Sequence, residues 1–421
     1  MALSDLGAVN RRNLAMLRRS PTAEISGALG DLGTLLPLMI ALALKGCIDL
    51  PATLVMTGLF NIATGAVFGI PLPVQPMKAI AAASIARSSV EMGGTLFAGT
   101  LVSLAVLVLS LTGLVRRLNQ HTPTAIIKGI QLGAGLQLVL SAGTSLLLGL
   151  DWTSPALDNR LWALLTFTLL LLAQRLRGPR FPFALLVFTA GLGLAVLSIL
   201  FPHRRGNHAP HLPRLAPWQP RFYLPLPEWS GVDTAIGMAV AQLPLTLLNS
   251  IVAVSALAAD LFPSEGELTP SVTTIGLSVA AMNLVGCWFG AMPVCHGAGG
   301  LAAQHRFGAR SGAAVIILGL AKVALGVLFG STLVDLFDAF PRGMLGVMLA
   351  AAGVELARAG VFLSGNQGEE GWTILLMTAA GTLALKDVGA GFAVGMMVYG
   401  VYRLGDYLER RGVGERRPLL R

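Results

Sequence analysis

Two short polar segments interrupt an otherwise apolar chain. The first, PLPVQPMKAIAAA (71–83), carries Gln75 and Lys78 among three prolines, and the second is PVCHGAGGLAA (293–303). Proline disrupts the interior of a helix but is tolerated at its start, where the first amides have no intrahelical partner. We therefore predict that each segment runs extended through its prolines and then forms a short helix with free amides at its beginning.

A helix N-terminus carries about half a positive charge, so two of them facing one cavity would bind an anion. Lys78 lies in the first turn of the first short helix. A cation there is unfavourable by about 0.3–1 kcal/mol, and burial near a bilayer centre costs roughly 2.5–3.5 kcal/mol more. Contact with an anion explains the position of Lys78. The alternatives are a structural pair with Asp31 and a side chain that extends to the membrane surface.

Further hydrogen-bond donors accompany these segments. The stretch AVAQLPLTLLNS places Gln242, Thr246 and Asn249 on one helical face. These side chains can donate to an oxyanion, and hydrogen bonding between helices is the alternative. The predicted substrate-binding residues are Gln75, Lys78, Gln242, Thr246, Asn249, Cys295, His296 and Gly297.

Asp31, in GALGDLGTLLPL, is a strong acid within the first apolar stretch. It could pair with Lys78, carry a coupling proton, or do both. The alternative is a helix-breaking or capping role among the neighbouring glycines. Lys322 lies within another apolar stretch, and an acid such as Glu355 is a guess for its partner.

The sequence contains no motif that supports an enzymatic activity. Cys47, Cys287 and Cys295 have no metal-ligand spacing, and adjacent Cys295 and His296 point apart, so they form no nucleophile–base pair. We predict no metal and no cofactor. The formal charge of +9 does not require a nucleic acid partner, because basic residues gather in the cytoplasmic loops of membrane proteins.

The amino-acid composition shows whether the helices that position these residues lie in water or in a lipid bilayer. Hydrophobic residues make up 54% of the 421 positions and charged residues 12%, against about 25% charged in ordinary soluble domains. Long runs such as LFAGTLVSLAVLVLSLTGLV (96–115) are long enough to cross a bilayer as helices, which take about 20 apolar residues. No period of two is visible, which disfavours a β-barrel. We therefore expect an all-α polytopic membrane protein in contact with lipid.

We expect about fourteen transmembrane segments, the third and tenth of them short. The segments are 24–44, 51–69, 73–86, 94–114, 124–149, 161–174, 182–200, 232–257, 271–290, 294–303, 312–330, 342–356, 372–386 and 389–404. An even number puts both termini on one side, and the larger share of basic residues makes that side cytoplasmic. We expect a multi-pass protein of the cell membrane.

The two halves of the chain share patterns in the same order. GTLLPL (33–38) corresponds to LTLLNS (245–250), and PVQPMKAIAA (73–82) to PVCHGAGGLAA (293–303). Seven spans per half is an odd number, so the second copy must enter from the opposite face, as an inverted repeat. The expected organisation is a cytoplasmic N-terminal segment (1–23), a first repeat (24–201), an inter-repeat loop (202–230), a second repeat (231–404) and a basic cytoplasmic tail (405–421).

GDLGTLLPL, PLPVQPMKAIAAA, QLPLTLLNS, DLFP and MPVCHGAGGLAAQHRFGARSG resemble the molybdate transporter family, which is related to SulP-type sulfate transporters. The resemblance implies the fold of the uracil permease. It implies a core of spans 1–4 and 8–11, a gate of spans 5–7 and 12–14, and substrate held between segments 3 and 10. SulP proteins usually carry a STAS domain after the membrane region, and we expect none here.

The expected function is secondary transport of a tetrahedral oxyanion, molybdate above all, by movement of core against gate. Sulfate has the same shape and charge, so a sulfate transporter is the alternative within this class. An anion channel is the alternative from another class, because broken helices also line pores. A homodimer is a candidate assembly.

Overall fold

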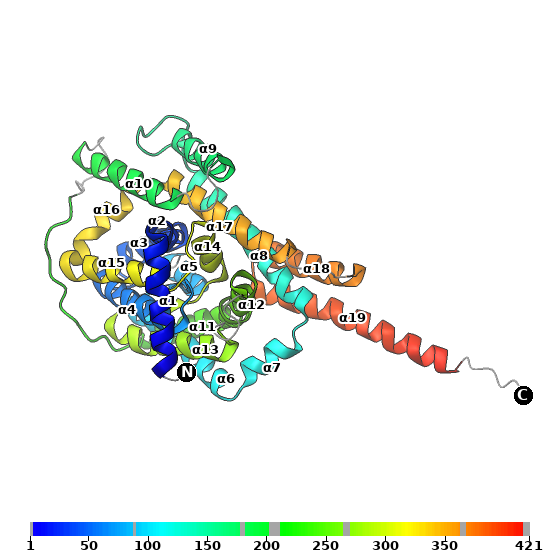
Figure 1. Cartoon of the computed structure of the whole chain (residues 1–421). Helices are drawn as coiled ribbons and strands as arrows, with labels where there is room; N and C mark the ends of the chain where they lie inside the picture. The colour runs from blue at the N-terminus through cyan, green and yellow to red at the C-terminus, as the bar shows by residue number, and fades with distance from the viewer. Residues whose placement is uncertain are drawn as a thin grey trace, which may run out of the picture.

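The computed structural model describes residues 3–86, 90–176, 182–201, 211–263, 270–362 and 368–415. Helices fill most of this part of the chain (Figure 1). Their bounds are α1 Leu3–Arg19, α2 Pro21–Ala28, α3 Leu32–Leu44, α4 Leu50–Phe68, α5 Lys78–Ala86, α6 Met92–Leu111, α7 Leu114–His121, α8 Thr124–Ser141, α9 Arg160–Leu176, α10 Phe183–Leu200, α11 Val232–Leu247, α12 Ala253–Leu261, α13 Val272–Gly286, α14 Ala298–Arg306, α15 Ala313–Phe329, α16 Val334–Asp338, α17 Arg342–Phe362, α18 Glu369–Leu385 and α19 Val388–Glu415.

Ten helical stretches in the described residues are long and apolar enough to cross a membrane. Some are built from consecutive helices, such as α2 with α3 and α11 with α12. The short helices α5 and α14 are not among the ten, in keeping with the expectation that segments 3 and 10 are short. The chain is therefore an all-helical polytopic membrane protein.

Two of the interrupted spanning stretches carry predicted site residues at the interruption. The first is broken at 29–31, between α2 and α3, where Asp31 occupies the N-cap position of α3 without a side-chain capping bond. The second changes from α11 to a π-helical turn, η3 (Leu248–Val252), before α12. Single π-helical turns within α-helices often mark functional sites, and this one contains Asn249.

A two-stranded antiparallel pairing lies among the helices. Strand β1 (Gln75–Pro76) precedes α5, and strand β2 (Val294–Cys295) precedes α14. Gln75 pairs with Cys295 and Pro76 with Val294. This pairing satisfies extended backbone that would otherwise be buried without partners, and it places the starts of both short helices side by side.

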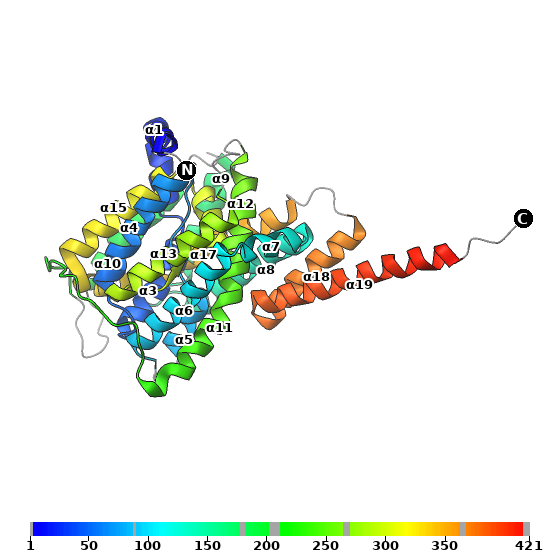
Figure 2. The ribbon, with the colours of Figure 1, turned by 90° about the horizontal axis from the view of Figure 1, so that it is seen from below.

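The helices form two groups in space. In one group α4 packs on α15 and α6 on α13, around β1 and β2. In the other group α8 packs on α17 and α18, and α18 packs on α19. Figures 1 and 2 show α18 and α19 extending away from the first group, with the C-terminal end of α19 farthest out.

The segment that leads into α11 runs along the surface of the first group (Figure 2). Its backbone amides at Ala216 and Tyr223 donate to Leu328 and Trp288, over 2.8 Å each, and the Tyr223 hydroxyl donates to Asp49 over 3.0 Å. We expected this loop at 202–230, and its first residues, 202–210, lie outside the described residues, as does part of the predicted tail (416–421).

Three helices were not predicted: α1, α7 and the short α16. Helix α1 occupies the segment that we expected to be a polar N-terminal extension, and it packs on α4 and α15. Asn13 fixes it there by donating to the Gly65 carbonyl over 3.0 Å and accepting from the Gly312 amide over 3.0 Å. The apolar residues of α1 and α7 line one face only, so neither helix has the continuous apolar run that predicts a membrane span.

Candidate functional site

The starts of α5 and α14 lie on the two strands. The Met77 amide, just before Lys78, donates to the Pro293 carbonyl over 2.9 Å, which extends the strand pairing by one bond. Asn283 of α13 supports the second strand, because it accepts from the Val294 amide and donates to the Val294 carbonyl, over 2.6 and 2.7 Å. The two helix N-termini are therefore held by a rigid backbone rather than by loops.

Gln75 faces the start of α14. Its Nε2 donates to Asp31 Oδ1 over 2.6 Å, and the side chain is buried. A Cβ added at Gly297 or Gly300 would lie 1.9 Å from the Gln75 amide group. Both positions must therefore be glycine for Gln75 to fit, and Gln75 occupies the space in front of the N-terminus of α14.

A cavity of about 430 Å³ adjoins the start of α5. Lys78 and Ala79 line it together with Thr34 of α3, Asn249 of η3 and Gly299 of α14. Lys78 is half-buried and forms no hydrogen bond or ion pair within the described part of the chain. A cation at a helix N-terminus, beside a cavity and without a direct hydrogen bond or ion pair to a described residue, is a complement for an anion.

Gln242 and Thr246 lie behind this cavity rather than in it. Gln242 Oε1 accepts from the Ala79 amide over 2.8 Å, and its Nε2 donates to Thr246 Oγ1 over 2.9 Å. Both side chains are fully buried. Gln242 thus accepts the hydrogen bond of one amide in the first turn of α5, so this amide is not free to bind a ligand. Of the three predicted residues on this stretch, only Asn249 lines the cavity. The Asn249 Oδ1 atom is buried without a hydrogen-bond partner.

Cys295 and His296 make contacts within the protein. The Ser250 hydroxyl donates to Cys295 Sγ over 3.1 Å. His296 Nδ1 lies 2.7 Å from the Pro73 carbonyl, and its Nε2 lies 3.0 Å from the Ser278 hydroxyl. Because a carbonyl only accepts, Nδ1 carries a proton and donates to it. Both ring nitrogens are therefore used in this conformation, and His296 links the first polar segment to α13.

The charged residues near the site form a chain of alternating sign. Asp31 interacts electrostatically with Lys78 and Lys322, and no ion pair joins Asp31 to Lys78 within the described residues. Lys322 Nζ donates to Asn61 Oδ1 over 2.9 Å. The guess that Lys322 pairs with Glu355 was wrong, because Glu355 binds Arg306 over 3.4 Å.

Several lining residues were missed from the sequence. Thr34 belongs to the quoted GTLLPL pattern, so the match between the two halves pointed to its stretch. Gln137 and Lys386 carried no such signal, because their place at the cavity depends on how α8 and the α18–α19 turn pack. Among the described residues, no three His, Cys, Asp or Glu side chains gather in a way that could hold a metal ion.

Comparison with known sequences gives matches over most of the chain. A family profile described as "Molybdate transporter of MFS superfamily" matches residues 23–138 and 234–356. The chain is 37% identical to molybdate transporter 2 of Arabidopsis thaliana, over 94% of this chain and 90% of that protein. It is 34% identical to molybdate transporter 1 of Chlamydomonas reinhardtii, over 89% of this chain and 90% of that one.

Solved structures with a similar fold come from anion transporters. The overall structure of SLC26A9 matches with a TM-score of 0.59 at 15% identity, over 91% of this chain and 65% of that one. The transmembrane domain of the cyanobacterial bicarbonate transporter BicA matches with a TM-score of 0.56 at 14% identity, over 89% and 97%. At these identities the likeness concerns the fold alone.

Proposed function

Because the chain belongs to the molybdate transporter family, we propose that it carries molybdate across a membrane through the cavity beside Lys78. The relatives named as molybdate transporters align over nearly their whole length. The substrate is therefore a tetrahedral oxyanion with two negative charges, and transport rather than enzyme chemistry is the activity.

The observation that carries this proposal is the position of Lys78 at the cavity without a direct hydrogen-bond or ion-pair partner. Its ammonium group lines a cavity and has no hydrogen bond or ion pair with a described residue. Asp31 interacts with this charge only from a distance, and a half-buried ammonium without a direct partner is costly, so a bound anion would stabilise the arrangement. Thr34 and Asn249 offer hydrogen-bond donors on other walls of the same cavity.

In this proposal the remaining predicted residues do not contact the anion but hold the helices that line the cavity. Gln242 and Thr246 fix the first turn of α5, while Gln75, Gly297 and His296 fix the start of α14 against β1. Cys295 lies on β2 next to Gln75 and holds Ser250 beside Asn249. Their substitution would displace Lys78 and Asn249 rather than remove a contact to the anion.

The cavity is larger than its cargo. Its volume of about 430 Å³ leaves room for waters beside one ion. A tetrahedral oxyanion fills a fraction of that space, so the walls must approach for every face of the ion to be contacted. Such closure is the movement that a carrier needs and an open pore does not.

The packing supports a 7+7 inverted repeat with a core and a gate. If the two halves are exchanged, the contact of α4 with α15 becomes that of α13 with α6, and the contact of α5 with α11 becomes that of α14 with α2. The contact of α8 with α17 maps onto itself. We assign α2–α6 and α11–α15 to the core, and α8–α10 and α17–α19 to the gate.

Asp31 is the proposed coupling residue, because it binds Gln75 and interacts electrostatically with Lys78 and Lys322. Both termini are proposed to face the cytoplasm of a cell membrane, since α1 and α7 carry exposed arginines at the same expected side. A homodimer stays a prediction.

The test is uptake by purified protein in liposomes, with molybdate, tungstate, sulfate and uracil compared. We expect molybdate uptake, and Lys78→Ala should weaken molybdate binding about 10- to 100-fold, since one charge-assisted hydrogen bond contributes ~1.5–3 kcal/mol. The matched control is Lys45→Ala, which removes an exposed lysine at the end of α3 and should leave binding unchanged.

The two alternatives predict other outcomes. Preferred uptake of sulfate over molybdate would make the protein a sulfate transporter. Flux of molybdate only down its gradient, under every ion gradient applied, would make it an anion channel. Equal binding by the Lys78→Ala variant and the parent would remove Lys78 from the site.

A further inference from the structure

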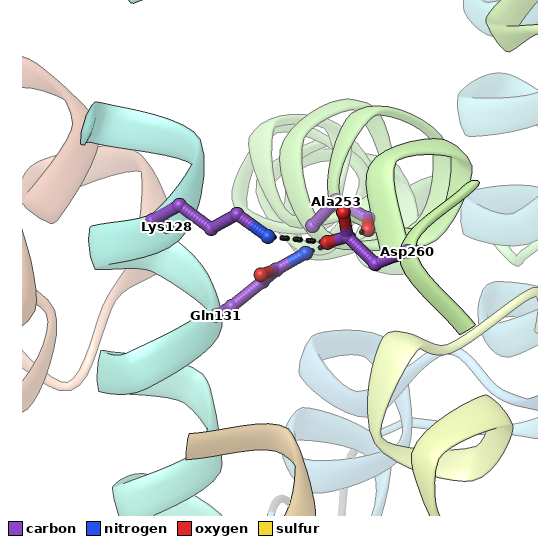
Figure 3. Close-up of polar contacts among 4 residues, drawn as sticks. All are labelled: Lys128, Gln131, Ala253 and Asp260. Atoms are coloured by element: carbon purple, nitrogen blue, oxygen red, sulfur yellow. Dashed lines mark hydrogen bonds and ion pairs between the residues drawn. The ribbon is translucent and has the colours of Figure 1, made fainter. Parts of the chain in front are cut away.

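Two polar contacts join α8 to α12 (Figure 3). Lys128 of α8 forms an ion pair with Asp260 of α12. One turn along α8, Gln131 Nε2 donates to the Ala253 carbonyl over 3.2 Å. Lys128 and Gln131 are three apart, so they present their side chains from one face of α8 towards α12.

These contacts are buried on the α8 side. Lys128 is 4% exposed and Gln131 is fully buried, while the Asp260 side chain is 26% exposed. Removing a lysine from water is costly unless a carboxylate compensates for it. Leu257 lies between Ala253 and Asp260 on the same face of α12 and is also fully buried. Water is therefore excluded between the two helices at this level.

A second ion pair joins the same two groups of helices. Arg306, at the end of α14, lies 3.4 Å from Glu355 of α17. In the assignment above, α12 and α14 belong to the core and α8 and α17 to the gate. Both ion pairs therefore connect core to gate.

Both ion pairs lie towards one end of the cavity, and Glu355 directly precedes Leu356, which lines it. On α8 the cavity is lined from Ala134 to Ser141, and Lys128 precedes Ala134, the nearest of these residues, by about 9 Å along the helix at 1.5 Å per residue. On α14 the cavity touches Gly299 near the start, whereas Arg306 is at the opposite end. The cavity reaches Lys386 and Asp387 in the α18–α19 turn, and both residues are exposed, so we place its mouth on the face of that turn.

We propose that Lys128–Asp260 and Arg306–Glu355 form a latch that closes the face opposite the cavity mouth and separates when the carrier opens to that face. The proposal rests on the core-against-gate movement in the proposed function. It gives a role to DLFP, a motif that begins at Asp260 and that the substrate site does not use. Gln131 and Leu257 complete the seal between the ion pair and the site.

An ion pair suits this role because its two ends are stable apart as well as together. When core and gate separate, each charge gains hydration that offsets the lost attraction, so the two states stay close in free energy. A purely apolar contact would expose surface to water on opening, with no such compensation. The latch therefore sets the ratio of the two conformations without preventing their exchange.

The test measures water access to Leu257 in purified protein, with both faces in contact with solution. Leu257→Cys is introduced alone and together with Asp260→Asn, and reaction with a membrane-impermeant maleimide is followed over time. We expect labelling to be about tenfold faster with Asp260→Asn, the factor that ~1.4 kcal/mol produces. The parent chain gives the background, since Cys47, Cys287 and Cys295 are all buried.

Asp233→Asn is the matched control, because Asp233 is an exposed acid in the first turn of α11, at the other end of the same interrupted helix. It should leave the labelling rate unchanged. The charge-swapped pair Lys128→Asp with Asp260→Lys should restore slow labelling, and it keeps the test decisive if Asp260→Asn folds poorly by size-exclusion chromatography.

Equal labelling rates with and without Asp260→Asn would overturn the latch, as would a charge-swapped pair that labels at the fast rate. These results are separate from the fate of the proposed function. Faster labelling in a protein that transports no molybdate would support the latch and contradict molybdate as the substrate. Molybdate uptake together with unchanged labelling would support molybdate as the substrate and contradict the latch.

Discussion

The contact of Gln75 with the start of α14 predicts a large effect from a single methyl group. In Gly300→Ala the new Cβ would lie 1.9 Å from Gln75 Nε2. Ordinary contact begins at 3.4 Å, so the amide must retreat by about 1.5 Å. That displacement breaks the hydrogen bond of 2.6 Å from Gln75 to Asp31.

The cost has two parts. Overpacking of a close-packed interior destabilises by ~1–3 kcal/mol, and a buried polar group that loses its partner adds ~1–3 kcal/mol. We therefore expect Gly300→Ala to lower the free energy of unfolding by about 2 to 6 kcal/mol. The matched control is Gly237→Ala, in the interior of α11 with no atom within 4 Å of the new Cβ. It should be stabilising by roughly 0.5–1 kcal/mol, because alanine suits a helix interior better than glycine.

A double-mutant cycle assigns the effect to Gln75. With Gln75→Ala in place the amide is absent and Pro73 Cγ, at 2.9 Å, remains the close neighbour of the new Cβ. Adding Gly300→Ala should then cost only the overpacking of ~1–3 kcal/mol, without the lost hydrogen bond. The assay is unfolding in mixed detergent micelles, followed by the loss of helical circular dichroism. If Gly300→Ala cost the same in both backgrounds, or were as mild as Gly237→Ala, the position assigned to Gln75 would be wrong.

Two further predictions concern titration. Asp31→Asn should flatten the pH dependence of molybdate uptake if Asp31 carries the coupling proton, and parallel pH profiles of variant and parent would restrict Asp31 to a structural role. Burial and the hydrogen bond to Asp49 raise the pKa of Tyr223, so this contact stabilises the fold below about pH 10 and is lost as pH rises through the raised pKa. Tyr223→Phe should reduce the fall in thermal stability above pH 10, and an unchanged fall would show that the contact contributes nothing.

Much of the fold follows from patterns that the sequence displays. Apolar runs separated by polar turns predict a polytopic helical protein, because length and hydropathy decide which helices cross a bilayer. Pro73 and Pro293 predict the extended stretches before α5 and α14, since proline cannot continue a helix interior. The structure pairs these stretches directly, as strands β1 and β2. Their hydrogen-bonding register depends on tertiary packing and could not be predicted.

The individual roles at the site were harder to predict. A sequence shows that Gln242 and His296 can donate hydrogen bonds but not what lies opposite them. In the structure Gln242 binds the Ala79 amide, and His296 binds Pro73 and Ser278. Lys78 differs because its charge must be compensated wherever it lies in the membrane, so its residue type and position indicate an anion, with Asp31 as the alternative partner.

The central claim is that the substrate binds in the cavity beside Lys78. Tungstate has the charge and shape of molybdate and scatters electrons strongly, so a structure of the protein with bound tungstate locates the oxyanion directly. We predict one dense peak within hydrogen-bonding distance of Lys78 Nζ, facing Thr34 and Asn249. A peak elsewhere along the helices, with this cavity occupied by water alone, would contradict the claim.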